Sequence, residues 1–253
     1  MSEALLSVRN LTKIFGGLVA VDGVSFDVAR GEVVGLLGDN GAGKSTLIKC
    51  ISGVHAAEDG EIVFDDKPVQ FATPMDARRA GIETIYQDLA LANNLDVGAN
   101  IFLGREVKTR HLGGLVQTLD DKHMRERSQH TLESLQIRFP SLTAPIEKLS
   151  GGQRQAVAIA RAVYWDARLM IMDEPTNNLG VPEQHKVLEL IRMLKGRGVP
   201  VILITHVMPD ALAVTDRIIV MHRGRKVSEK ITARTNAEEL VQYMVGARKD
   251  AAA

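Results

Sequence analysis

The chain has 253 residues, which is enough for one large α/β domain or for a main domain with a smaller lobe. Apolar residues make up 45% and charged residues 25%, as in an ordinary globular protein. Lys plus Arg equals Asp plus Glu at 31 each, whereas proteins that bind nucleic acids by neutralising phosphates usually carry a basic surplus. The composition therefore argues against a nucleic-acid partner.

Cys50 is the only cysteine, so an intrachain disulfide is impossible and a reducing cytoplasm is the simplest setting. The start of the chain, Met1-Ser2-Glu3-Ala4, lacks the charged-then-apolar layout of a signal peptide. Apolar stretches such as Val201–Ile204 are far shorter than the ~18 residues needed to span a bilayer. We therefore expect the protein to touch a membrane only through a partner.

Short β-type runs alternate with helical patterns along the chain. Strands are predicted at 5–8, 24–28, 33–37, 61–64, 82–86, 169–172 and 201–205, with a hairpin at 217–221 and 225–228. Helices are predicted at 44–51, 76–80, 120–135, 153–164, 183–195 and 237–245. Between about 96 and 138 the pattern becomes helical and charged after Gly113-Gly114, which predicts a small helical lobe inserted in the sheet domain. The tail at 251–253 is expected to fray.

The run Gly38-Asp39-Asn40-Gly41-Ala42-Gly43-Lys44-Ser45 fits G-x-x-x-x-G-K-[ST] at every fixed position, between a predicted strand and a predicted helix. Its glycines let backbone N–H groups approach phosphate oxygens, and the following helix points its positive dipole end at the anion. Lys44 adds a mobile positive charge for the β- and γ-phosphates, and Ser45 offers a hydroxyl to Mg²⁺. The run predicts a nucleoside triphosphate site, without distinguishing a kinase, a GTPase or an ATPase.

Two acids, Asp173 and Glu174, follow the apolar strand Leu169–Met172, and Pro175 then ends the strand. Ligands of open α/β sheets bind at the carboxyl ends of the strands, which is where both acids are expected to lie. Asp173 is placed there to hold Mg²⁺, directly or through water. Glu174, one residue on, is a candidate general base that polarises an attacking water.

The run Leu149-Ser150-Gly151-Gly152-Gln153 precedes a strongly predicted helix, with Ser150 as its N-cap and two glycines that expose backbone N–H groups. It is a second anion-binding helix N-terminus, and one triphosphate has no use for two such sites from one chain. Head-to-tail pairing of two copies is a simple solution, because each phosphate loop would then face the other copy's glycines. This run resembles the signature of ABC (ATP-binding cassette) proteins, and the resemblance implies such a nucleotide-sandwich dimer.

The resemblance covers roughly residues 5 to 245 and implies an α/β fold. The expected fold consists of a P-loop NTPase core (1–87 and 168–250) with a mainly parallel sheet, an N-terminal antiparallel β subdomain and an inserted helical signature subdomain (about 88–167). It implies that Phe15 stacks on adenine, that Gln87 contacts Mg²⁺ or the attacking water, and that His206 stabilises the γ-phosphate. The implied catalytic residues are Glu174, His206 and Gln87, and the implied Mg²⁺ ligands are Ser45, Gln87 and Asp173. The implied ATP-binding residues are Phe15, Gly38, Asp39, Asn40, Gly41, Ala42, Gly43, Lys44, Ser45, Thr46, Ser150, Gly151, Gly152 and Gln153. The other six histidines show no metal-ligand spacing and are expected to be solvated.

Individual sequence segments, such as Asn100–Glu106 and Glu174–Val181, resemble the monosaccharide-import branch of bacterial ABC ATPases. That branch implies integral membrane permease subunits, an extracytoplasmic sugar-binding protein, and a peripheral place on the cytoplasmic face of the bacterial inner membrane. Many branch members carry two cassettes, so this single cassette needs a second copy or a related partner. At Gly180 the chain departs from the family pattern, because most members have an aspartate there.

Two other classes compete with the transport ATPase. A soluble ABC ATPase of DNA repair or translation usually carries coiled-coil insertions, zinc modules or paired cassettes, and this sequence has none of them. A GTPase would need an Asn/Thr-Lys-x-Asp guanine reader, which is also missing, and a P-loop kinase leaves the signature run unexplained. The sequence therefore favours the transport ATPase.

Overall fold

The structure is a computed structural model, and it describes residues 4–111, 116–139 and 141–248. The predicted break at Gly113-Gly114 and the tail at 251–253 lie outside the described residues. Contacts between Cα atoms divide the chain into two compact units. The first comprises Met1–Gln87, Arg168–Pro175 and Ile191–Ala253, and the second comprises Asp88–Ala167 and Thr176–Leu190. The second unit thus includes residues 176–190, which the sequence-based division places in the core.

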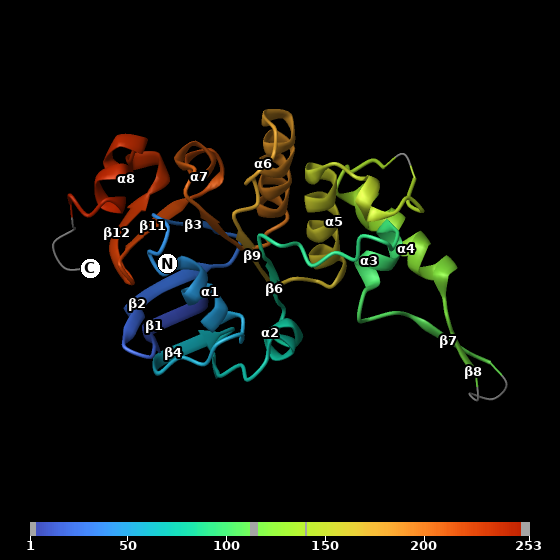
Figure 1. Cartoon of the computed structure of the whole chain (residues 1–253), viewed down its shortest axis with the longest axis horizontal. Coiled ribbons are helices and arrows are strands. Elements are labelled where there is room, and N and C mark those ends of the chain that lie inside the picture. Colours follow the sequence, from blue (N-terminus) through green and yellow to red (C-terminus); the bar gives the residue numbers. More distant parts are fainter. Residues whose placement is uncertain (1–3, 112–115, 140, 249–253) are drawn as a thin grey trace. The chain divides into compact units, whose positions relative to one another are not determined.

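An antiparallel sheet opens the first unit, in the strand order β2-β1-β4-β5 (Figure 1). Its strands are β1 (Ala4–Phe15), β2 (Leu18–Ala29), β4 (Asp59–Phe64) and β5 (Lys67–Val69). The first two are much longer than the predicted runs, because they pair as one hairpin and several register shifts absorb their irregular pattern. The antiparallel N-terminal subdomain implied by the family resemblance is confirmed.

A six-stranded sheet carries the rest of the first unit, in the order β12-β11-β3-β10-β9-β6. Its strands are β3 (Val33–Gly38), β6 (Ile82–Ile85), β9 (Leu169–Asp173), β10 (Val201–Thr205), β11 (Arg217–His222) and β12 (Arg225–Ile231). All neighbours are parallel except β11 and β12, which form the predicted hairpin. Every residue of β3 and β10 is buried, as expected for parallel strands covered on both faces.

Helix α1 (Lys44–Ile51), at its predicted place, packs between the two sheets (Figure 1). The apolar core there joins side chains of α1 and β1 to alternate residues of the parallel strands, such as Val34 and Leu36 of β3. The opposite face of the sheet is covered by α7 (Met208–Val214) and α8 (Ala237–Met244). Helix α2 (Pro74–Ala80) begins with a capping box at Thr73 and ends at Gly81. Because α1 packs on one face of the parallel sheet and α7 and α8 on the other, the strand ends that carry the candidate site are held in place.

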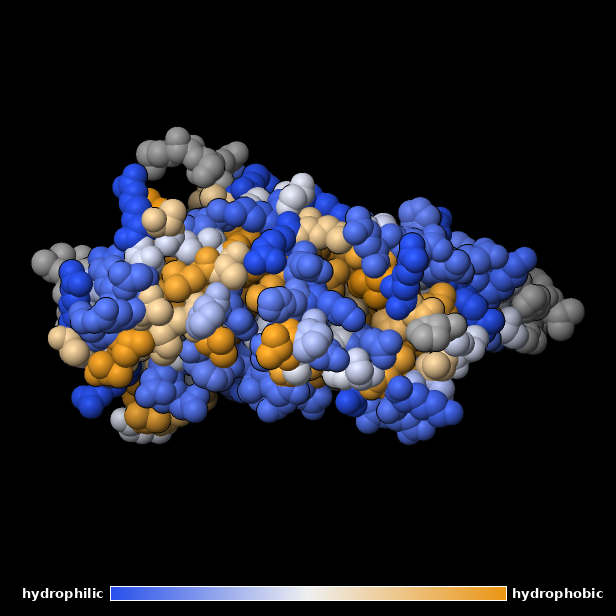
Figure 2. Space-filling model, turned by 90° about the horizontal axis from the view of Figure 1, so that it is seen from above, coloured by the Kyte–Doolittle hydropathy of each residue, from blue (hydrophilic) through white to orange (hydrophobic). Residues whose placement is uncertain are grey.

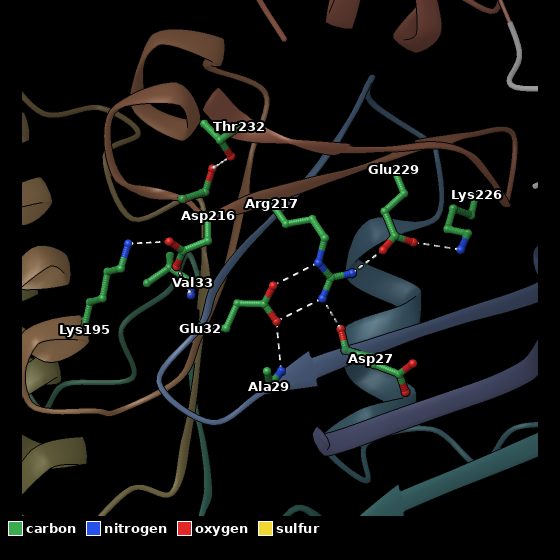
Figure 3. A network of polar contacts seen from close by, with 11 residues as sticks. Asp27, Ala29, Glu32, Val33, Lys195, Asp216, Arg217, Lys226, Glu229 and Thr232 are labelled. Atoms are coloured by element: carbon green, nitrogen blue, oxygen red, sulfur yellow. Dashed lines mark hydrogen bonds and ion pairs between the residues drawn. The ribbon is translucent and has the colours of Figure 1, made fainter. Parts of the chain in front are cut away.

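A partly buried ion network ties the β2–β3 turn to β11 and β12 (Figure 3). The Arg217 guanidinium donates to both oxygens of Glu32, at 2.9 Å each, and also pairs with Glu229. Lys226 adds a second cation to Glu229 at 3.0 Å. Burial acts to raise the pKa of Glu229, but hydrogen bonds and charge from Lys226 and Arg217 outweigh it and hold the pKa below its usual value. The network thus joins strands that are far apart in the sequence.

The second unit is mainly helical, with α3 (Val97–Phe102), α4 (Asp121–Ser134), α5 (Gly151–Tyr164) and most of α6 (Val181–Gly196). Sequence patterning missed α3 and the small hairpin of β7 (Lys108–His111) and β8 (Val116–Leu119). The fully buried Asn100 holds the preceding loop through hydrogen bonds to the backbone of Ala92, Leu95 and Asp96. Short-range polar contacts of this kind leave no periodic signal in the sequence.

No helix within the described residues is long and apolar enough to cross a bilayer. On the face shown in Figure 2, hydrophilic side chains surround smaller apolar patches.

Candidate functional site

The phosphate loop connects β3 to α1, and at two of its positions the structure has room only for glycine. A Cβ on Gly38 would lie 2.5 Å from the Met221 carbonyl oxygen, so any other residue would push β11 away. Gly43 has φ +98°, and a Cβ there would lie 2.4 Å from the Ala20 oxygen. The glycines therefore allow the loop to lie against the backbones of two neighbouring strands.

Lys44 is 6% exposed, and its ammonium donates to the carbonyl oxygens of Gly38 at 2.8 Å and Asp39 at 3.1 Å. Burial lowers the pKa of Lys44, while the carboxylates of Glu174, Asp173 and Asp39 act in the opposite direction. The cation is thus held inside the loop by weak backbone acceptors, which a phosphate can replace with a stronger charged one.

Asp173 is the last residue of β9, and its carboxylate lies close to the Ser45 hydroxyl. Burial, and then the neighbouring charge of Glu174, raise the pKa of Asp173, while Ser45 and Lys44 lower it. Two carboxylates and a hydroxyl lie together here, and hard cations prefer oxygen ligands of this kind. The residues present therefore fit Mg²⁺.

Glu174 follows with φ +53°, a left-handed conformation that is uncommon for residues other than glycine. Its backbone N–H donates to the Ile204 carbonyl oxygen at 2.9 Å, which holds this turn against the end of β10. His206 follows β10, and its Nδ1 lies 2.6 Å from Glu174 Oε2. The strained turn thus directs the Glu174 carboxylate toward the imidazole.

A cavity of about 640 Å³ lies over the phosphate loop, and all of its lining residues belong to the first unit. The predicted residues that line it are Phe15, Asn40, Gly41, Ala42, Gly43, Lys44, Ser45, Thr46, Gln87, Asp173 and Glu174. Gly38, Asp39 and His206 do not line it but contact Lys44 or Glu174. Sequence reasoning missed the side formed by Leu18, Val19, Ala20, Arg223 and Gly224. The only signal there, Arg223-Gly224, predicts a hairpin turn and says nothing of a cavity.

The hairpin turn reaches the site through backbone hydrogen bonds. Gly224 N–H donates to the Ala42 oxygen at 3.0 Å, and Asp22 N–H donates to the Gly224 oxygen at 2.8 Å. These bonds bring β2, the phosphate loop and the β11–β12 turn together, so the cavity has walls from three distant parts of the chain.

Ser150 is the N-cap of α5, which confirms the predicted capping role, although the helix begins at Gly151 rather than at Gln153. The Ser150 hydroxyl accepts from Gln153 N–H at 3.3 Å, and Gln153 Oε1 accepts from Ser150 N–H at 2.9 Å. The glycines are covered by side chains of the same unit: a Cβ on Gly151 would lie 2.7 Å from Leu179 Cδ2, and one on Gly152 would lie 2.7 Å from Glu183 Cγ. Ser150–Gln153 belong to the second unit.

Gly180, where the family resemblance leads us to expect an aspartate, lies beside the same glutamate. A Cβ on Gly180 would lie 2.9 Å from Glu183 Oε2, and its φ lies outside the left-handed region. Glycine is therefore not required here by the backbone, and the carboxylate of Glu183 fills the space that a side chain at position 180 would take.

The mainly parallel sheet, the phosphate loop and the acidic strand end together define a P-loop nucleotide-binding protein. Residues 21–177 match the ABC transporter family. The chain is 52% identical over 240 residues to a xylose/arabinose import ATP-binding protein, XylG, of Sulfolobus acidocaldarius, covering 95% of this chain and 93% of that protein. It is 43% identical over 249 residues to a fructose import ATP-binding protein, FrcA, of Rhizobium meliloti, covering 98% and 96%.

Solved structures agree with the sequence relatives. A nucleotide-free ATP-binding cassette from an ABC transporter superposes with a TM-score of 0.81 at 26% identity, covering 96% of this chain and 95% of the other. A dimeric cassette in a post-hydrolysis state bound to ADP and phosphate has a TM-score of 0.74 at 25% identity, covering 90% and 98%. This chain belongs to the ABC transporter family and is one of its ATP-binding cassettes. The resemblance found in the sequence is thereby confirmed.

Proposed function

We propose that this chain binds and hydrolyses ATP as the energy-supplying subunit of an importer for a simple sugar. The observation that carries the proposal is the single cavity that joins the phosphate loop to the acidic end of β9. The relatives named for import of xylose, arabinose and fructose support a monosaccharide as cargo. The cassette works with integral permease subunits on the cytoplasmic face of the cell membrane, and an extracytoplasmic sugar-binding protein delivers the cargo.

In this proposal Lys44 and the loop N–H groups neutralise the phosphates, while Phe15 stacks on adenine from the far end of the cavity. Ser45, Asp173 and Gln87 would hold Mg²⁺, and an ion bound there would supply positive charge to the phosphate oxygens. Burial raises the pKa of the Asp173 carboxylate, and a cation held beside it would offset this cost of burying the charge.

Glu174 orients the attacking water and accepts its proton, and His206 donates a hydrogen bond to the γ-phosphate. The distance of 2.6 Å between His206 Nδ1 and Glu174 Oε2 supports this division of roles, because it places the imidazole directly beside the carboxylate that lines the cavity. The turn at Glu174 limits how far the carboxylate can move between binding and hydrolysis.

The second half of each ATP site comes from another cassette, either a second copy or a related chain. Ser150, Gly151, Gly152 and Gln153 of that cassette close on the γ-phosphate through the N-terminus of α5. The dimeric relative with ADP and phosphate supports such an arrangement. Closure follows from contacts that ATP makes only in the paired state, and hydrolysis removes them.

Glu174→Gln tests the hydrolytic assignment. The variant should bind ATP with near wild-type affinity, lose about 10²- to 10⁴-fold in hydrolysis, and elute as an ATP-dependent dimer in size-exclusion chromatography. Full activity in this variant would contradict the general-base role.

Ser150→Arg tests the trans site. ATP binding to the isolated chain should stay close to wild type while hydrolysis is lost, and a collapse of monomer binding would disprove the shared site. The remaining rival is a soluble ABC ATPase of DNA repair or translation. Recovery of the chain without any integral membrane protein, from gently solubilised cells, would favour it over the transporter.

A further inference from the structure

Phe15 ends β1 and lines the nucleotide cavity with 42% of its surface exposed. Two polar side chains contact its ring. Lys13 Nζ lies over the ring, 5.0 Å from its centroid, and the His55 ring packs against it at 5.2 Å with an interplanar angle of 77°. Neither Lys13 nor His55 lines the cavity. The ring is thus contacted from outside the cavity and keeps a free surface toward it.

Lys13 is itself firmly held. It is 9% exposed, and its ammonium donates to the Ala56 carbonyl oxygen and to Glu58 Oε1, both at 2.7 Å. The other oxygen of Glu58 accepts from the backbone N–H of Ile14, also at 2.7 Å. Hydrogen bonds from Lys13 and then Ile14 lower the pKa of Glu58, so the carboxylate stays charged. One carboxylate therefore fixes both the cation over the ring and the backbone next to Phe15.

We propose that Lys13, Glu58 and His55 are positioning residues that hold the Phe15 ring ready for the adenine base. The inference rests on the proposed function, in which Phe15 stacks on adenine. A cation over one face of an aromatic ring leaves the opposite face available for stacking. Because the ring is ordered before the nucleotide arrives, binding loses less side-chain freedom, and affinity rises without any new contact to the nucleotide.

The test compares probes with and without a base. Lys13→Met removes the ammonium and keeps the length of the stem. It should raise the Kd of ATP and of ADP by about 2- to 10-fold, the range expected for one side chain ordered on binding. The Kd of inorganic tripolyphosphate should not change, because that probe reaches only the phosphate loop. In hydrolysis assays KM should rise by the same factor as the Kd of ATP, with kcat at saturating ATP retained.

Three matched variants separate positioning from general damage. Lys13→Arg keeps the cation and should restore most of the affinity. Glu58→Gln, at an exposed position, should reproduce the loss on its own even if Lys13→Met folds poorly. In a Phe15→Ala background Lys13→Met should have no further effect, since it acts only through the ring.

The outcomes distinguish the inference from the function on which it rests. Weaker tripolyphosphate binding by Lys13→Met, an undiminished effect in the Phe15→Ala background, or an unchanged Kd of ATP would each overturn the positioning role. Normal ATP affinity in Phe15→Ala alone would instead show that Phe15 does not stack on adenine. Isothermal titration calorimetry on the full chain measures every arm.

Discussion

Replacing Gly180 by aspartate, the residue most family members carry there, should destabilise this protein. The backbone accepts any residue at this position, but a Cβ would lie 2.9 Å from Glu183 Oε2. The two carboxylates would then lie about 4 Å apart, where like charges repel by about 1 kcal/mol in water and about 4 kcal/mol at an effective dielectric of 20. Glu183 is half-buried and its end can swing away, so we expect a loss of about 1–2 kcal/mol.

Urea unfolding of five variants, among them Glu183→Gln alone, measures this charge effect. Gly180→Asn matches the shape of aspartate without its charge and should be nearly neutral, as should Gly180→Ala. Adding Glu183→Gln to Gly180→Asp should recover most of the loss, which gives a coupling free energy of about 1–2 kcal/mol in a double-mutant cycle. If Gly180→Asp and Gly180→Asn lose the same stability, or if Glu183→Gln restores nothing, the electrostatic explanation fails and only steric crowding remains.

Three further predictions concern charges of the first unit. Arg217→Met leaves the partly buried carboxylate of Glu32 without its cation and should cost about 2–3 kcal/mol in urea unfolding, whereas Arg225→Met, at an exposed ion pair, should cost less than about 1 kcal/mol; equal losses would contradict the network's role. Two arginines lower the pKa of Asp65 from 3.8 to about 2, so its stabilising effect is complete above pH 3.8 and is lost as pH falls toward 2; Asp65→Asn should lack this part of the acid unfolding profile. The raised pKa of Asp173 means that its charge opposes folding above pH 3.8, so Asp173→Asn should raise the thermal midpoint of the nucleotide-free protein and abolish Mg²⁺-dependent hydrolysis; a lowered midpoint would refute this sign.

The parallel core was predictable because burial and covalent order act together there. Every residue of Val201–Thr205 is buried and all but the last are apolar, and the phosphate loop and acidic strand end follow strands of this kind within a few residues. The second unit was harder to predict. Helix α3 has only six residues, so its buried apolar side chains, Val97, Ile101 and Phe102, make too short a pattern to indicate a helix, and the contacts of the Asn100 amide with the preceding loop leave no periodic signal at all. The β7–β8 hairpin is too short and polar to show an alternating pattern.

The histidines also divide into those whose place the sequence predicts and those whose contacts it does not. His206 is identified by its place after a buried strand, and it lies beside Glu174 as that placement suggests. His55 was expected to be solvated; it is half-buried and also packs on Phe15, a contact between residues forty positions apart that no local pattern records. A role that depends on sequence spacing was therefore recoverable, whereas one that depends on tertiary contact was not.

The two ends of the cavity differ in how far local sequence motifs determine them, and we therefore expect substitutions at the two ends to have different effects. The phosphate end is built from contiguous motifs, whose glycines and charges are dictated by the triphosphate itself. The end proposed for the base is assembled from the edge of β1 and β2 and the turn at Arg223-Gly224, joined by backbone hydrogen bonds that any sequence of suitable shape can make. Substitutions at the phosphate end should therefore abolish function. Those at the base end should shift affinity by small factors, which makes the comparison of ATP with tripolyphosphate the most direct measure of how this cassette recognises its nucleotide.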